Sequence, residues 1–326
     1  MGSHIHRWGE DMKFHKLLVP LDGFEQAEGI LPYAVRLASS LDIPIVLLTV
    51  IDPEASVVPE RFRNPDGQNR EVGEAFDPFR FADIEAAARN MLETVATQLS
   101  NRGIASEYRV VRGVPAIEIV QTASELDCDL IAMSTHGRNI FSRAILGSVT
   151  DKVVHTSTVP VLTTTMAMKG DISVEQVKLG EVVVPLDGSA LAETALPYAE
   201  SLARSISLEI KLVTVIDTGG PYQGLMDDAR FAELDPEIRA NALAYLRRLA
   251  GELRAKGLSV RADVTDGNPG FVLTQMLHEP RQRIVVMATH GLSGLSRWWL
   301  GSITETLIRT SADPVLVIPS SSQIDD

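Results

Sequence analysis

Short apolar runs and amphipathic stretches alternate along this chain, and the same succession occurs twice. Runs such as "KLLVPL", "IVLLTV", "LIAMS" and "RIVVMA" are apolar at nearly every position, as expected for parallel strands covered on both faces. Between the runs, apolar residues recur every three or four positions, the period of a helix with one buried side. Over 80–102 these residues are Ile84, Ala88, Met91, Leu92, Val95 and Leu99. The alternation predicts an α/β fold with a doubly wound sheet and helices on both faces.

The predicted elements follow one order in both halves of the chain. In the first half we expect helices at 24–40, 80–102, 115–126 and 147–157. The strands of the first half are expected at 16–21, 44–50, 105–112, 129–134 and 160–164. Those of the second half are expected at 181–186, 208–215, 258–264, 283–288 and 314–318.

Three short motifs occur once in each half, at one spacing. They are "VPLDG" at 19–23 and 184–188, "LPYA" at 31–34 and 196–199, and "TVID" at 49–52 and 214–217. Each pair is 165 residues apart, whereas later pairs such as Gly113 and Gly267 are 154 apart. The first half therefore has 11 extra residues after "TVID", in a stretch rich in Pro, Gly and charge that is typical of a surface loop. A period this long indicates a duplicated domain rather than a solenoid repeat.

The duplication divides the chain into two domains and a linker. The first domain is predicted at 14–166 and the second at 180–320, with the linker at 167–179. Residues 1–13 are an N-terminal tail or a cloning remnant, and 321–326 are a C-terminal tail.

Composition and charge narrow the classes of function. The net charge of −13 argues against nucleic acid as a partner, because a nucleic-acid binder needs a basic surface. No apolar run approaches the ~18 residues that span a bilayer, so no membrane association is expected. The single cysteine, Cys128, cannot form an internal disulfide, which favours a cytoplasmic location. We expect it to have a packing role rather than to be a reactive thiol.

Two aspartates lie where a ligand would bind in a doubly wound sheet, beyond the carboxyl ends of strands. Asp22 and Asp187 end the first strand of their halves in "PLDG". Either carboxylate can accept a hydrogen bond from an adenine amino group or a ribose hydroxyl. The alternative is that each aspartate caps the next helix or closes an Asx-turn.

A longer repeated feature follows the fourth strand. It reads "STHGRNIFSRAILGS" at 134–148 and "ATHGLSGLSRWWLGS" at 288–302: His-Gly, nine residues, then Gly-Ser at the start of a helix. Glycine lets backbone amides approach an oxyanion, serine can donate to it, and the helix dipole favours negative charge at that end. The alternative is an ordinary N-cap, in which a serine follows a glycine.

For the other side chains in this loop, the sequence gives weaker evidence of a role in ligand binding or catalysis. Arg143 and Arg297 coincide between the halves and either pair with a phosphate or are solvated or interface arginines. His136 and His290 have no cluster of Asp, Glu or Cys near them in sequence, so we expect them to shape the loop rather than to catalyse.

The joint pattern of "PLDG", "TVID" and the His-Gly to Gly-Ser interval resembles the universal stress protein family, along nearly the whole length of both halves. The chain thus resembles a tandem universal stress protein. This resemblance implies a five-stranded parallel sheet in each domain and a crevice that binds ATP or AMP. It also implies that the two domains pair through their last strands, around "PVLTTT" and "PVLVIP".

The nucleotide-binding form of that family has the pattern Gly-two-Gly-nine-Gly-Ser/Thr. Together with the loop arginines, it gives as candidates in the first half Pro20, Asp22, Val50, Met133, Ser134, Gly137, Arg143, Gly147, Ser148 and Val149. In the second half the candidates are Pro185, Asp187, Val215, Met287, Ala288, Gly291, Arg297, Gly301, Ser302 and Ile303. The chain departs from the pattern at its first glycine, where it has the small residues Ser134 and Ala288.

We therefore expect a cytoplasmic stress-response protein with a regulatory role that binds ATP, ADP or AMP in one or both domains, with Mg²⁺ able to accompany the nucleotide. Its other expected contact is the intramolecular pairing of the domains, with a homodimer as a further option. The chain has no GxxxxGK[ST] loop, so efficient phosphoryl transfer is not expected and we do not predict an enzyme. A slow ATPase and a nucleotide-free scaffold stay open as alternatives.

The two halves differ beside the predicted site. Ser189 is placed to cap the first helix of the second half, where the first half has Phe24, and this favours the second site. Trp298 and Trp299 replace Ala144 and Ile145 and belong to no shared ligand machinery, but their bulk can crowd the second loop.

Overall fold

The computed structural model describes residues 12–54, 59, 62, 78–135, 146–165, 177–217, 228–278, 282–289 and 301–319. In the first half the strands are β1 (Leu17–Pro20), β2 (Ile45–Ile51), β3 (Ser106–Arg112), β4 (Leu130–Ser134) and β5 (Val161–Thr164). The helices of this half are η1 (Glu25–Ile30), α1 (Leu31–Leu41), α2 (Pro78–Ser100), α3 (Pro115–Glu125) and α4 (Ser148–Thr156).

The second half repeats this succession. Its strands are β6 (Glu181–Pro185), β7 (Glu209–Ile216), β8 (Val260–Asp266), β9 (Arg283–Ala288) and β10 (Val315–Ile318). Its helices are α5 (Ala190–Glu193), α6 (Leu196–Ile206), α7 (Asp228–Ala255), α8 (Pro269–Met276) and α9 (Ser302–Thr310). The α/β alternation predicted from the apolar pattern is confirmed.

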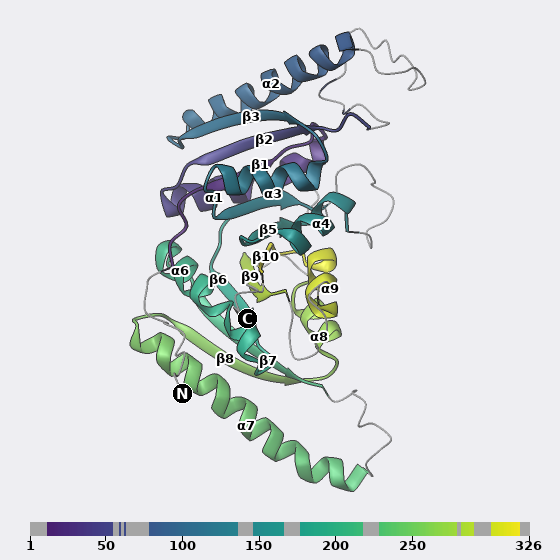
Figure 1. Cartoon of the computed structure of the whole chain (residues 1–326). Helices are drawn as coiled ribbons and strands as arrows, with labels where there is room; N and C mark the ends of the chain where they lie inside the picture. Colours follow the sequence, from purple (N-terminus) through teal and green to yellow (C-terminus); the bar gives the residue numbers. More distant parts are fainter. Residues whose placement is uncertain are drawn as a thin grey trace, which may run out of the picture.

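All ten strands form one sheet, in the order β3-β2-β1-β4-β5-β10-β9-β6-β7-β8 (Figure 1). Neighbouring strands are parallel within each half, but β5 and β10 pair antiparallel, with Leu162 opposite Leu316. The last strands therefore join the halves, as the resemblance implied. The strand order reads the same from either end, which is the arrangement of two like units about a two-fold axis.

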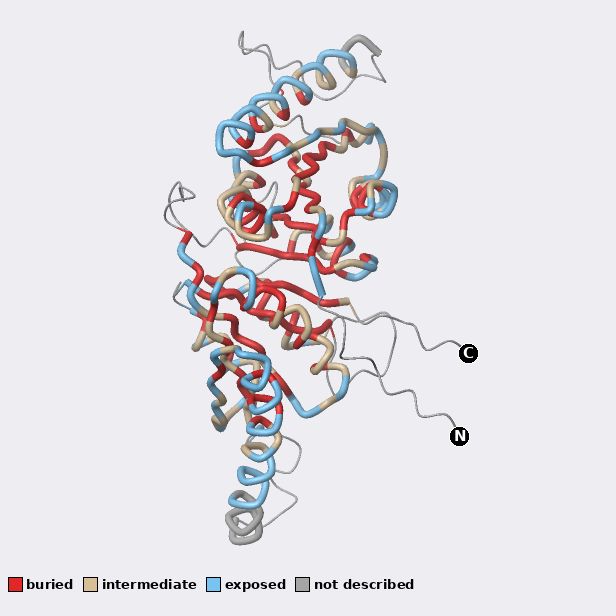
Figure 2. Tube along the Cα trace, turned by 90° about the vertical axis from the view of Figure 1, so that its left-hand side faces the viewer, coloured by how far each residue is buried: buried red, intermediate tan, exposed pale blue. Residues whose placement is uncertain are grey.

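Each face of the sheet carries its own buried core, because successive strand side chains point to opposite faces. Leu17 and Val19 of β1 belong to the core under α1, α2, α6 and α7, whereas Leu18 belongs to the core under α3, α4, α8 and α9. We call these the α1 face and the α3 face. Figure 2 shows the buried part of the trace concentrated in the strands, while the outward turns of the helices are exposed. In Figure 1, α2 and α7 lie at the two ends of the sheet.

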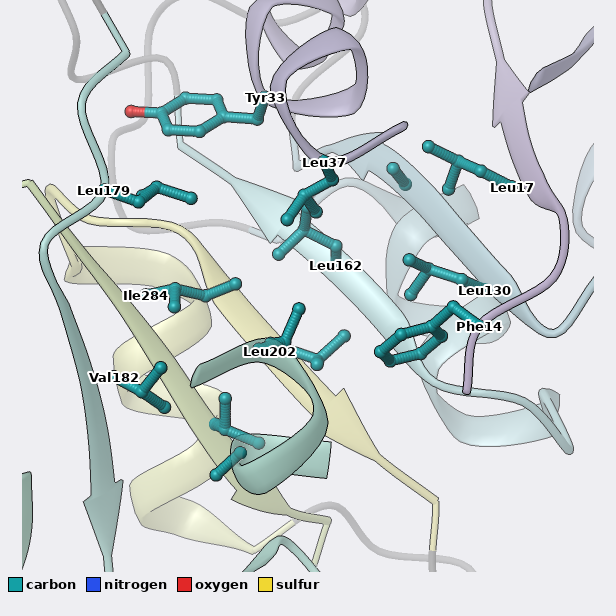
Figure 3. Packing of buried hydrophobic residues seen from close by; sticks show 14 of the residues in the cluster. Phe14, Leu17, Tyr33, Leu37, Leu130, Leu162, Leu179, Val182, Leu202 and Ile284 are labelled. Atoms are coloured by element: carbon teal, nitrogen blue, oxygen red, sulfur yellow. The ribbon is translucent and has the colours of Figure 1, made fainter. Parts of the chain in front are cut away.

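The core of the α1 face runs without interruption from one half into the other. Figure 3 shows Leu37 of α1 and Leu162 of β5 beside Leu202 of α6 and Ile284 of β9, all four buried. The sheet and the core it covers are thus shared by the two repeats.

Two tyrosines mark the approximate symmetry of this junction. Tyr33 of α1 belongs to the first half, and burial followed by the negative charge of Asp313 in the second half raises its pKa. Tyr198 of α6 belongs to the second half, and burial followed by the charge of Asp129 in the first half raises its pKa. Each "LPYA" motif therefore places its tyrosine near a carboxylate of the other half.

The helix predicted at 24–40 is confirmed over 25–41, but its first part is a 3₁₀ helix rather than an α-helix. Residues 25–30 form the 3₁₀ helix η1, and α1 begins at Leu31 with Pro32 in its first turn. Proline has no N–H to donate, so a continuous helix would lose a backbone hydrogen bond here. The Leu31 N–H instead bonds the Glu28 carbonyl, the tighter 3₁₀ pattern. In the second half, Pro197 lies in the same position of α6, after the short helix α5.

An ion pair ties the outermost helix of each half to its edge strand, with the charges exchanged. In the first half, Glu85 of α2 pairs with Arg112 at the end of β3, at 2.8 Å. In the second half, Arg239 of α7 pairs with Asp266 at the end of β8. Arg239 and Asp266 are each 154 residues after Glu85 and Arg112, so the equivalent contact is made in both halves with the two charges exchanged.

Two further sequence expectations meet the structure here. Cys128 is 3% exposed, and burial raises the pKa of its thiol to about 11, in keeping with a packing role. In the part of the chain that the structure describes, no helix is long and apolar enough to cross a membrane.

Candidate functional site

The strand order places one candidate crevice in each half. The chain proceeds from β1 outward to β2 and β3, then returns to the other side of β1 with β4. Ligands bind beyond the carboxyl ends of strands at such a reversal, where helix N-termini also point. The first crevice therefore lies where β1 and β4 end, and the second where β6 and β9 end.

The aspartate after the first strand of each half closes an Asx-turn. In the first half the Phe24 N–H donates to Asp22 Oδ1 at 3.0 Å, and in the second the Ser189 N–H donates to Asp187 Oδ1 at 3.0 Å. The alternative prediction, that each aspartate closes an Asx-turn, is therefore confirmed. A carboxylate has about four acceptor positions on two oxygens, so the turn is compatible with a ligand contact as well.

Ser189 also confirms the difference between the halves that the sequence predicts. Its hydroxyl accepts from the Ala192 N–H at 3.0 Å as the N-cap of α5, and it donates to Asp187 Oδ1 at 2.6 Å. Phe24, in the corresponding position before η1, has no side-chain cap. The Ser189 side chain therefore gives the helix after β6 a cap that Phe24 does not give the helix after β1.

The helix starts at Gly147-Ser148 and Gly301-Ser302 are not ordinary serine caps. Glycine itself is the N-cap of α4 and of α9, with no side-chain capping bond, and the serine is the first helical residue. The alternative of a serine N-cap is therefore wrong. Both serines are exposed, and each glycine has a φ near −60°, which any residue can adopt. Glycine is thus not needed for its backbone angle, and what it provides is a helix start without a side chain.

Backbone bonds fix these helix starts against the sheet. The Gly147 N–H donates to the Thr135 carbonyl at 2.8 Å, and the Thr135 N–H donates to the Thr164 carbonyl of β5 at 2.9 Å. In the second half the Gly301 N–H donates to the Thr289 carbonyl at 2.7 Å. The start of each helix is therefore held beside the end of β4 or β9, next to the crevice.

Four threonines position this site, and the sequence reasoning missed them. Thr150 and Thr304, in the first turns of α4 and α9, donate to the carbonyls at the ends of β4 and β9, both at 3.0 Å. Thr49 and Thr214 donate to the carbonyls of the residues just before Asp22 and Asp187, at 2.9 and 3.0 Å. The available signal was their recurrence, since Thr49 and Thr214 open "TVID", and Thr150 and Thr304 come two residues after the repeated serines.

The apolar candidates of each half belong to the core of the α3 face or pack against it. Met133 is buried in the core of that face, and Val50 and Val149 pack against the same core. In the second half the corresponding residues are Met287, Val215 and Ile303, with Met287 buried. Pro20, Pro185 and Ser134 are partly exposed at strand ends, whereas Ala288 is buried. These predicted residues therefore lie at the ends of β1, β2 and β4 and the start of α4, and at the ends of β6, β7 and β9 and the start of α9.

Four predicted site residues, Gly137, Arg143, Gly291 and Arg297, lie outside the described residues, as do His136, His290, Trp298 and Trp299. Their predicted roles stay predictions. Among the residues that are described, no group of three or more His, Cys, Asp or Glu side chains is placed to hold a metal ion.

Comparison with known proteins assigns both halves to one family. The model of the universal stress protein family matches residues 13–164 and again 179–319. The chain belongs to the universal stress protein family. The resemblance seen in its motifs is confirmed, and the two matches agree with a tandem arrangement of universal stress protein domains.

Similar proteins include chains with one such unit and chains with two. Universal stress protein MJ0577 of Methanocaldococcus jannaschii is 30% identical over 152 residues, covering 46% of this chain and 93% of that protein. Universal stress protein Rv2005c of Mycobacterium tuberculosis is 22% identical over 312 residues, covering 95% of this chain and 98% of that protein. The crystal structure of a universal stress protein from Archaeoglobus fulgidus superposes with a TM-score of 0.65 at 22% identity, covering 94% of this chain and 97% of that one. The tandem fold is therefore shared with proteins of similar length.

Proposed function

We propose that this universal stress protein is a cytoplasmic regulatory protein that binds ATP, ADP or AMP in the crevices of its domains and responds to stress through that binding. The observation that carries the proposal is the pair of helix starts at Gly147-Ser148 and Gly301-Ser302. Each begins without a side-chain cap, presents an exposed serine and is fixed by backbone hydrogen bonds beside the end of β4 or β9.

The chemistry of these groups suits a nucleotide. Backbone N–H groups at a helix N-terminus have no partner within the helix, and the helix dipole favours an anion there. They would receive the phosphates, with the serine hydroxyl as a further donor. The apolar side chains of Val50, Met133 and Val149, or their counterparts in the second half, would pack against the base. Asp22 or Asp187 would accept from the ribose or the base.

We propose binding without efficient catalysis. The chain contains no GxxxxGK[ST] loop, and the described residues offer no cluster of metal ligands. Any Mg²⁺ would accompany the phosphates of the nucleotide rather than occupy a protein site of its own. A slow ATPase and a nucleotide-free scaffold are the alternatives that the experiment has to exclude.

Thermal unfolding of the full chain tests the proposal. With ATP at 100 times its dissociation constant, the folded state gains about 2.7 kcal/mol, which corresponds to a rise of roughly 5 °C in Tm for a protein of this size. Removing a phosphate donor with Ser148→Ala and Ser302→Ala together should reduce the rise, whereas Ser259→Ala, a serine before β8, should not. No rise with millimolar ATP, ADP or AMP, with or without Mg²⁺, would refute nucleotide binding and leave the nucleotide-free scaffold as the alternative. Steady phosphate release that the Ser302→Ala change abolishes would instead support the ATPase.

A further inference from the structure

The turn that follows the first strand of each half has a similar backbone conformation in both halves, but its glycine is buried in one half and exposed in the other. Gly23 and Gly188 follow Asp22 and Asp187, and both have a left-handed φ, +79° and +85°. Gly23 is nevertheless buried, whereas Gly188 is exposed. Since the turns are alike, the difference in burial comes from what lies on them.

The cover in the first half is the ring of Phe62. A Cβ added to Gly23 would lie 2.5–2.8 Å from three ring carbons of Phe62, so the ring rests directly on this glycine. Phe62 itself is only 8% exposed. At Gly188, no atom of the described residues lies within 4 Å of the corresponding point.

Phe62 comes from the segment that distinguishes the halves. It follows β2 within the stretch where the first half is 11 residues longer than the second. Asp22, which precedes the covered glycine, is partly buried, whereas Asp187 is exposed. The extra length therefore coincides with a covered aspartate turn in one half and an exposed one in the other.

We propose that Phe62 makes the two nucleotide sites unequal, so that the second half binds nucleotide tightly and the first half binds it weakly. This inference rests on the proposed function. A ribose or base that reaches Asp22 has to displace the ring from Gly23 and return its apolar surface to water, which costs binding free energy. The affinity of the first site is lowered by the fraction of molecules in which the ring has moved away. Among the described residues none lies on Gly188, which is exposed, so nucleotide at the second site has no corresponding ring to displace there.

Calorimetric titration of the full chain with ATP tests this inequality. The unaltered protein should show one tight site and a second site at least roughly tenfold weaker, since a buried phenylalanine has to be exposed. Phe62→Ala should strengthen the weak site until the two affinities lie within about threefold of each other, and Phe62→Leu should have an intermediate effect. Phe81→Ala removes a ring from α2 in the same half and should leave the inequality unchanged.

Changing the aspartates one at a time assigns the sites. Asp187→Ala should abolish the tight site of the unaltered chain, whereas Asp22→Ala should leave that site in place. In the combination of Phe62→Ala with Asp187→Ala, one site of restored affinity should remain. Thermal unfolding of each variant without nucleotide shows that it is folded.

Two equal sites in the unaltered protein, or a weak site that Phe62→Ala does not strengthen, would overturn the inference while leaving nucleotide binding intact. Failure of every variant to bind ATP, ADP or AMP would overturn the proposed function itself, and the inference with it.

Discussion

The joined sheet predicts that the two halves unfold as one unit, and Leu162 and Leu316 test this directly. They are cross-strand partners where β5 meets β10, and they are 0% and 1% exposed. Both belong to the core of the α1 face, which extends through both halves. Either change to alanine leaves a cavity in a fully packed region and should cost about 3 kcal/mol, within the usual range of roughly 2–5.

The coupling between the two positions is the informative quantity. Because the two side chains are directly opposite, the second truncation enlarges the cavity left by the first rather than opening a separate one. We expect a coupling free energy of about 0.5–1 kcal/mol in a double-mutant cycle of Leu162→Ala and Leu316→Ala. Leu47 of β2 provides a matched control, since it is also 0% exposed and belongs to the same core. It lies four strand spacings from β10, about 19 Å, so Leu47→Ala and Leu316→Ala should be additive within about 0.5 kcal/mol.

Urea denaturation followed by circular dichroism supplies the free energies of unfolding. All variants should show one transition with an unchanged slope, since the halves share a sheet and a core. The reasoning would be refuted by two separate transitions in the unaltered protein. It would equally be refuted if Leu162 and Leu316 were no more strongly coupled than the control pair.

Two further predictions concern buried ionisable groups. Arg283 Nε and Asp313 Oδ2 are 2.8 Å apart with side chains 6% and 3% exposed, so Asp313→Ala should remove the carboxylate of a buried ion pair and cost about 3–5 kcal/mol in urea denaturation. Arg283→Met combined with Asp313→Leu should recover most of that cost, and a cost below about 1 kcal/mol for Asp313→Ala alone would contradict the argument. Burial raises the pKa of Cys128 to about 11, so its thiol stays protonated in the folded protein at pH 8 and should react with a thiol reagent only after unfolding. Because the folded state holds this proton more tightly, its contribution to stability should be lost as pH rises from about 9 to about 11, and rapid labelling of the folded protein at pH 8 would show that the thiol is accessible.

Much of the fold can be read from the sequence because the apolar pattern and the repeat are strong signals. The strands differ from their predicted limits by a residue or two, and the pairing of β5 with β10 follows from the family resemblance. The 3₁₀ start of the first helix was not predicted, although its cause is visible as Pro32. The apolar period continues from η1 into α1, because a 3₁₀ turn and an α-helical turn bury nearly the same side.

The sequence predicts where the candidate site residues lie in the fold, but not which contacts their side chains make. The sequence placed Asp22 and Gly147 at a strand end and at a helix start, and both are found there. It could not decide between an Asx-turn and a ligand contact for Asp22, because one carboxylate can make both. It also could not indicate that Phe62 lies on Gly23, since that contact joins two loops separated along the chain and has no periodic pattern.

The exchanged ion pairs have a consequence for how the two repeats can be recombined. Glu85 matches Arg112, and Arg239 matches Asp266, but each helix carries the wrong charge for the strand of the other half. A chimaera that joined α2 to β8 would place Glu85 opposite Asp266, and the reverse chimaera would place Arg239 opposite Arg112, so attraction would become repulsion. Exchange of short segments between the halves, in the laboratory or in a genome, is therefore penalised unless helix and strand move together. In each half the charge on the outermost helix matches the charge on its own edge strand, and it does not match the edge strand of the other half.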